Sequence, residues 1–82
     1  MDALDGNAIA GMLFDHFGRE MTTARGECMV CSARAEIAEL VVFMTGPGAV
    51  VRCRSCGRVV IVAVEIRGTT RVDLAGFRLA EG

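Results

Sequence analysis

The four cysteines of this chain form two Cys-x-x-Cys motifs, and these are the residues whose spacing points most directly to chemistry. The motifs are Cys28 to Cys31 and Cys53 to Cys56, with 21 residues between them. In such a motif both sulfurs can point at one centre, so two motifs supply the four thiolates of a tetrahedral zinc site. The sequence therefore predicts one Zn²⁺ per chain, bound by Cys28, Cys31, Cys53 and Cys56.

Two other uses of the cysteines are less favoured. Disulfides need an oxidising compartment, but the N-terminus carries Asp2 and Asp5 and has neither a basic region nor a long apolar run typical of a signal peptide. A thioredoxin-like redox pair needs one motif at a helix start within a βαβ unit, whereas here two motifs lie within strand patterns. No apolar run approaches the roughly 20 residues of a membrane span, so we expect a cytoplasmic protein with no membrane partner.

Three arginines, Arg52, Arg54 and Arg58, bracket the second motif. Their guanidinium groups can contact phosphates, which makes them candidate nucleic-acid-binding residues. They can equally offset the formal charge of −2 on a zinc tetrathiolate, and we favour this interpretation. The chain has a formal net charge of −1 and contains no Trp or Tyr, so neither a strongly basic footprint nor a stacking platform supports general nucleic-acid binding.

No set of residues suggests catalysis. Four thiolates leave no open coordination position on zinc, and Asp15 and His16 have no nucleophile tied to them by spacing. The lone histidine is better explained as a helix residue near a C-terminus than as a metal ligand. We therefore expect a protein that is not an enzyme and has no small-molecule substrate.

A chain of 82 residues is expected to form a single domain, 1–82, whose hydrophobic core alone gives only about 3–5 kcal/mol of net stability. Structural zinc contributes on the order of 10–16 kcal/mol of apparent binding free energy. Metal binding is therefore expected to decide whether the chain folds.

The elements that would position the cysteines begin with a helix at 5–18. Apolar residues recur at helical spacing from Ile9 to Phe17, Asp5 or Asn7 can cap the start, and Gly18 stands where a left-handed residue ends a helix. A ribbon sheet is predicted over 21–74, with strands at 21–27, 39–45, 49–52, 59–66 and 70–74 and a charged connection at 32–37. Gly46-Pro47-Gly48 predicts a tight turn, and 75–82 is a tail.

Two of the predicted strands, at 41–44 and 59–64, are apolar on both sides rather than alternating. Such strands need cover on both faces, but one helix of about 20 Å covers only one face. The tail or a partner surface is expected to cover part of the other face.

The run from Cys53 to Gly57 resembles the second knuckle of rubredoxin-like zinc ribbons, in which glycine follows Cys-x-x-Cys. The first motif departs from this pattern because Ser32 stands in the glycine's place. The whole chain is similar to small uncharacterised actinobacterial zinc-ribbon proteins that begin with Met-Asp-Ala-Leu-Asp-Gly-Asn. This resemblance implies a fold and no activity.

These observations predict a small α+β, mainly β, zinc ribbon, in which an N-terminal helix packs on a three- to five-stranded antiparallel sheet and two knuckles close the metal site at one end. The predicted function is a non-catalytic, zinc-stabilised interaction module, a protein–protein adaptor or accessory subunit that binds a protein partner or forms a homodimer. A nucleic-acid-binding ribbon is one alternative. A thiol or zinc redox switch is another, and with iron in the site the protein would be a rubredoxin-like electron carrier, although four Phe make an aromatic-poor core.

Overall fold

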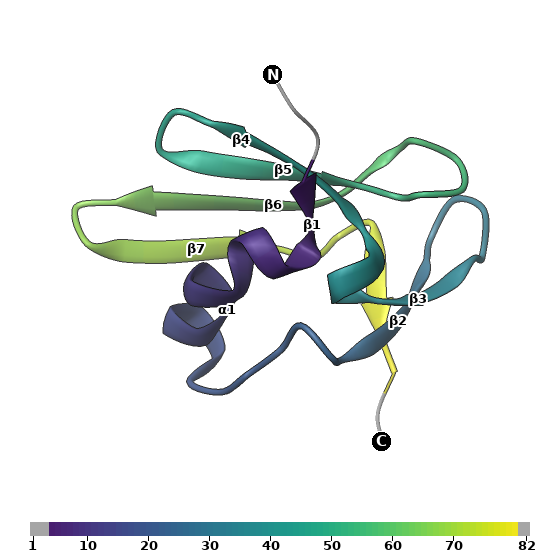
Figure 1. The fold of residues 1–82 in the computed structure, drawn as a ribbon, viewed down its shortest axis with the longest axis horizontal. Coiled ribbons are helices and arrows are strands. Elements are labelled where there is room, and N and C mark those ends of the chain that lie inside the picture. Colours follow the sequence, from purple (N-terminus) through teal and green to yellow (C-terminus); the bar gives the residue numbers. More distant parts are fainter. Residues whose placement is uncertain (1–3, 81–82) are drawn as a thin grey trace.

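The computed structural model describes residues 4–80 of the chain (Figure 1). The first three residues of the N-terminal motif, and the last two residues of the predicted tail, lie outside the described residues. The elements in chain order are β1 Leu4–Asp5, η1 Gly6–Ile9, α1 Ala10–Phe17, β2 Arg25–Cys28, β3 Arg34–Glu36, η2 Ile37–Glu39, β4 Val41–Thr45, β5 Gly48–Arg52, β6 Val59–Ile66, β7 Thr69–Asp73 and β8 Phe77–Leu79. No helix of this part of the chain is long and apolar enough to cross a membrane.

The strands form two antiparallel sheets, which corrects the expectation of one ribbon sheet over 21–74. The larger sheet has the order β1-β4-β5-β6-β7, and the smaller sheet has the order β3-β2-β8. The segment 32–37, expected to be a connection, contains β3, which pairs with β2 through Arg25 opposite Glu36 and Glu27 opposite Arg34. Opposite charges that face each other across a strand pair stabilise the pair. Neither strand has enough apolar residues to be predicted from its hydrophobic pattern.

The N-terminal helix is shorter than the predicted 5–18. Asp5 caps the start of the helical segment as expected, because its Oδ1 accepts a hydrogen bond from the Asn7 amide at 3.0 Å. The first turn of this segment, however, is the 3₁₀ helix η1 and not an α-helix. The α-helix begins only at Ala10 and ends at Phe17. Gly18, which follows it, is left-handed (φ 75°) and donates its N–H to the carbonyl of Phe14 at 2.7 Å. Gly18 therefore ends the helix as the sequence indicated.

The core lies between the larger sheet, α1 and the smaller sheet. Figure 1 shows α1 beside β7 and the smaller sheet at the other end of the molecule. The fully buried side chains come from every one of these elements and include Ile9, Leu13, Ile37, Val42, Val51, Ile61 and Phe77. The two sheets therefore share one core.

The tail is a structural element of this core. Its strand β8 pairs with β2, and Phe77 is only 2% exposed. Gly76 donates its N–H to the carbonyl of Val60 at 3.1 Å, and a Cβ at this glycine would come within 2.7 Å of the Val60 backbone. The tail thus covers the Val60 end of the larger sheet and then turns into the smaller one.

The two faces of the larger sheet differ in burial. On the inner face, Val42, Val51 and Ile61 are each 0% exposed. On the opposite face Val62 is 36% exposed, and Phe43, Val50 and Val64 are half-buried. We call the face that carries these four residues the open face.

Candidate metal centre

The four cysteines come together from both sheets at one end of the molecule. Cys28 ends β2, and Cys31 lies in the turn that leads to β3. Cys53 and Cys56 lie in the connection between β5 and β6. Their four sulfur atoms all lie within 4.8 Å of one another. A metal ion held by them would therefore join the two sheets.

The two cysteine turns have the same backbone geometry. In the first turn Ser32 donates its N–H to the carbonyl of Cys28 at 2.9 Å, and in the second Gly57 donates to Cys53 at 3.0 Å. Both donors are left-handed, with φ of 66° for Ser32 and 76° for Gly57. Serine at the glycine position therefore does not change the first turn, although it adopts a conformation that costs a side-chain-bearing residue about 1–2 kcal/mol.

Backbone amides also point at two of the sulfurs. Val30 donates its N–H to Sγ of Cys28 and Ser55 donates to Sγ of Cys53, each at 3.4 Å. Hydrogen bonds to a sulfur favour its thiolate form, which is the form that binds metal. The matched pair of bonds makes the two turns equivalent halves of one site.

The sulfur spacing fits a tetrahedral ion. Sγ of Cys28 lies 3.7 Å from Sγ of Cys56, and Sγ of Cys31 lies 3.6 Å from Sγ of Cys53. A tetrahedron with metal–sulfur bonds of about 2.3 Å, as in zinc sites, has edges of about 3.8 Å. Both of these short contacts join sulfurs of different motifs, so neither motif acts as an isolated pair. These four cysteines could hold a metal ion.

The sulfurs differ in exposure and in proton affinity. Cys28 and Cys53 are buried, whereas Cys31 and Cys56 are exposed. The backbone amide of Cys31 is the largest of the contributions that lower the pKa of the Cys28 thiol to about 7. Against the lowering effect of the Ala33 amide, desolvation and hydrogen bonds shared with the other cysteines raise the pKa of Cys31 to about 12. In the metal-free protein the cluster thus shares protons unevenly, and metal binding must release them.

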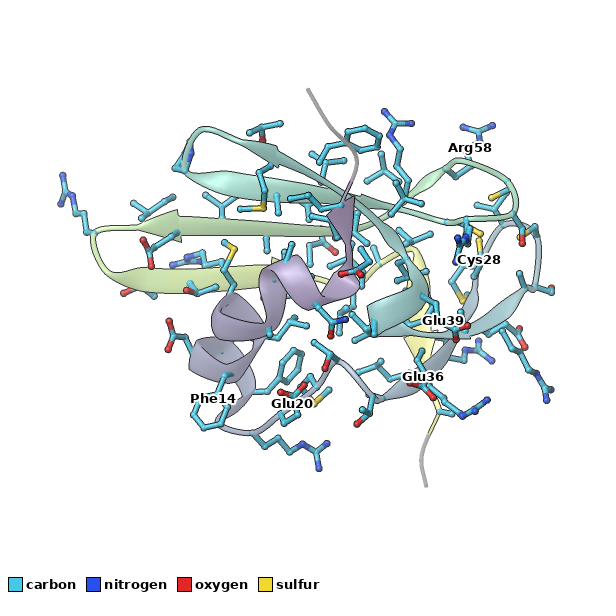
Figure 2. All side chains as sticks on the ribbon, in the orientation of Figure 1. Phe14, Glu20, Cys28, Glu36, Glu39 and Arg58 are labelled. Carbon is cyan, nitrogen blue, oxygen red and sulfur yellow. The ribbon has the colours of Figure 1, made fainter. Side chains whose placement is uncertain are left out.

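The three predicted arginines lie at this end of the molecule, but they are held differently. Arg52 donates from Nη1 to the carbonyl of Gly57 at 2.9 Å, and its guanidinium carbon lies 5.8 Å from the centre of the Phe43 ring. Arg54 and Arg58 are exposed on the second cysteine turn, and Figure 2 shows Arg58 at the same end as Cys28. Arg52 therefore braces the second turn and also belongs to the edge of the open face.

His16, the single histidine, is not part of the cluster. Its Nδ1 lies 3.1 Å from the carbonyl oxygen of Thr70, to which it can donate a hydrogen bond. This contact ties α1 to β7. The histidine is thus a structural residue, in agreement with the reading of the sequence.

The sequence did not reveal that the tail supports the first cysteine turn. Met29 donates its N–H to the carbonyl of Gly76 at 2.9 Å, and the neighbouring Cys28 pairs with Phe77 across β2 and β8. The sequence predicted the tail as one of two covers for the larger sheet, but it carried no signal that places Phe77 beside the metal centre.

Over residues 1–81 the chain matches a family described as "Family of unknown function (DUF6510)". Among the curated proteins and the solved structures, none matches the chain.

Proposed function

Because the chain belongs to this family, whose function is unknown, we propose a function from the metal centre and the surface alone: a zinc-stabilised, non-catalytic interaction module that binds a protein through the open face. The observation that carries the proposal is the combination of a closed four-thiolate site with an apolar sheet face that the described chain leaves partly exposed.

Zinc is the ion that the donor set favours. Tetrahedral sites made of four cysteines typically hold zinc or iron, and the edges of 3.6 and 3.7 Å suit a metal–sulfur bond of about 2.3 Å. Four protein ligands would leave no position for water or substrate, so the ion would be structural rather than catalytic. Its role would be to fasten the smaller sheet to the larger one.

The open face is the surface best suited to a protein partner. Val59 and Val62 are 42% and 36% exposed, and they lie in the same sheet as the half-buried Phe43, Val50 and Val64. Contiguous apolar surface of this kind usually marks an interaction site. The smaller sheet offers no such surface, because its exposed residues are the arginines Arg25, Arg34 and Arg78. Two of them form ion pairs, Arg25 with Glu36 at 3.5 Å and Arg34 with Glu27 at 3.6 Å.

The nucleic-acid alternative has less support. Arg52 contacts Gly57 and Phe43, whereas the side chains of Arg54 and Arg58 are exposed and form no hydrogen bond or ion pair with the described residues. Two exposed arginines with no neighbouring aromatic side chain for base stacking are better explained by compensation of the negative charge of the metal centre than by binding to a nucleic-acid backbone.

The experiment is site-specific photo-crosslinking in cells, with a photoreactive phenylalanine at Val62 on the open face. The matched control places the same residue at Val30, a valine that is 59% exposed on the first cysteine turn. We expect protein adducts from Val62 and not from Val30. Adducts from Val30 alone, or adducts to nucleic acid at either site, would overturn the proposal.

A further inference from the structure

We infer that the partner of the open face is a second copy of this chain, bound face to face about a two-fold axis that runs parallel to the strands between β5 and β6. This inference rests on the proposed function, because it names the occupant of the same surface. Three features of the residue register carry it.

The first feature is a row of side chains that is apolar at its centre. Phe43 on β4, Val50 on β5, Val62 on β6 and Asp73 on β7 are register partners, so they lie side by side on one face. Strands are spaced about 4.8 Å apart, so this row is roughly 15 Å long. The proposed axis exchanges Val50 with Val62 and Phe43 with Asp73. Valine thus meets valine at the centre, and Asp73 of the second copy comes over Phe43.

The second feature is the charge at the place where Asp73 would arrive. The guanidinium carbon of Arg52 lies 5.8 Å from the centre of the Phe43 ring, so this cation already occupies the surface that faces Asp73 of the second copy. Asp73 is exposed, and its Oδ1 accepts from the Ala75 amide at 2.8 Å, which leaves the other carboxylate oxygen for a cation. Because the axis is two-fold, the same pair forms twice, once on each side of the valines.

The third feature is the fit of the neighbouring row. Thr45, Gly48, Val64 and Arg71 are likewise register partners, and the axis exchanges Gly48 with Val64. Gly48 has no side chain, and a Cβ there would lie 3.3 Å from Cγ2 of Val64 in the same copy, so the apolar Val64 side chains of the two copies meet beside the glycines. Arg71 comes over Thr45, so no two like charges face each other across these two rows.

The size of the surface sets the strength to expect. Four strands spaced about 4.8 Å apart, each contributing about five residues of 3.4 Å, give a flat area of roughly 300 Å² per copy. The accessible surface buried by both copies would then lie below the roughly 1,200 Å² of stable specific interfaces. We therefore expect a reversible dimer with a dissociation constant on the order of 10–100 µM.

The test is sedimentation velocity of the zinc-loaded protein from 5 to 500 µM, with charge-swapped variants. Arg52→Asp and Asp73→Arg should each weaken dimerisation at least tenfold, because each places two like charges opposite each other. The double variant should restore it, because the pair re-forms with its signs exchanged. Arg54→Asp, a charge reversal beside the metal centre but off the open face, is the matched control and should leave the dimer unchanged.

A further variant keeps the test independent of the contact between Arg52 and Gly57, which the second cysteine turn needs. Val62→Glu should abolish the dimer while zinc content and circular dichroism stay unchanged. A wild-type protein that is monomeric up to 500 µM, or a dimer that tolerates both Val62→Glu and the single charge reversals, would overturn the inference. If the protein is monomeric and Val62 still crosslinks another protein in cells, the proposed function stands and only the second copy as occupant is refuted.

Discussion

Replacing Phe77 by alanine should strongly lower the thermal stability of the zinc-loaded protein. Phe77 is only 2% exposed, and its ring packs against Gly26, where an added Cβ would come within 2.3 Å of the ring carbon Cε2. The ring therefore fills the space between β8 and β2 with no room to spare. Alanine would leave a cavity beside Cys28, in the part of the core that carries the first cysteine turn.

The expected cost can be compared with the stability available. Truncation of a buried phenylalanine to alanine costs about 3–5 kcal/mol, which equals the whole net stability of about 3–5 kcal/mol that a core of this size supplies. Zinc adds on the order of 10–16 kcal/mol of apparent binding free energy. Phe77→Ala should thus still fold with zinc, but with a clearly lower melting temperature than the wild-type protein.

The assay is thermal unfolding followed by circular dichroism in the presence of one equivalent of zinc. With zinc, Phe77→Ala should lower the melting temperature by at least about 12 °C, since each kcal/mol corresponds to roughly 4–8 °C in a domain of this size. Phe14→Ala is the matched control, because Phe14 is 53% exposed and lies on the side of α1 away from the sheet (Figure 2). Equal shifts for the two variants would refute the reasoning that the tail belongs to the core.

Two further predictions concern the cysteine turns and their arginines. Ser32→Gly should raise the stability of the zinc-loaded protein by up to about 1 kcal/mol in urea unfolding, because glycine adopts the left-handed φ of 66° without strain; a loss of stability would show that the serine side chain itself supports the turn. The double variant Arg54→Glu, Arg58→Glu should weaken zinc binding, because these arginines offset the charge of the tetrathiolate. It should not alter binding to RNA or DNA oligonucleotides in a filter assay, because wild-type binding is expected to be negligible. Tight wild-type binding with a steep salt dependence that the double variant removes would favour a nucleic-acid-binding protein instead.

Local sequence signals predicted several elements well. The strand predicted at 59–66 coincides with β6. This segment is a run of mostly β-branched residues, which strongly favour strands. The turn at Gly46 and the helix end at Gly18 follow from positive φ, which glycine adopts most readily. The clustering of the four cysteines also agrees with the prediction, because the Cys-x-x-Cys spacing is a local constraint that both turns satisfy.

The division into two sheets could not be predicted in this way. Strands β3 and β8 have three residues each, too few to show a period, and β3 consists of Arg34, Ala35 and Glu36. What fixes these strands is pairing with β2 from both sides, which brings residues 25–28 together with 77–79. That pairing depends on contacts about 50 residues apart in sequence, and a single sequence read along the chain carries no signal for them.

Native mass spectrometry of the purified protein tests the central claim most directly, because the account requires one zinc ion bound by Cys28, Cys31, Cys53 and Cys56 to join the two sheets. We expect a folded charge-state distribution with one zinc per chain. Substitution of either buried ligand, Cys28→Ser or Cys53→Ser, should remove the metal and broaden the distribution toward unfolded charge states. A metal-free protein that remains fully folded, or a red protein with iron in the site, would contradict the account.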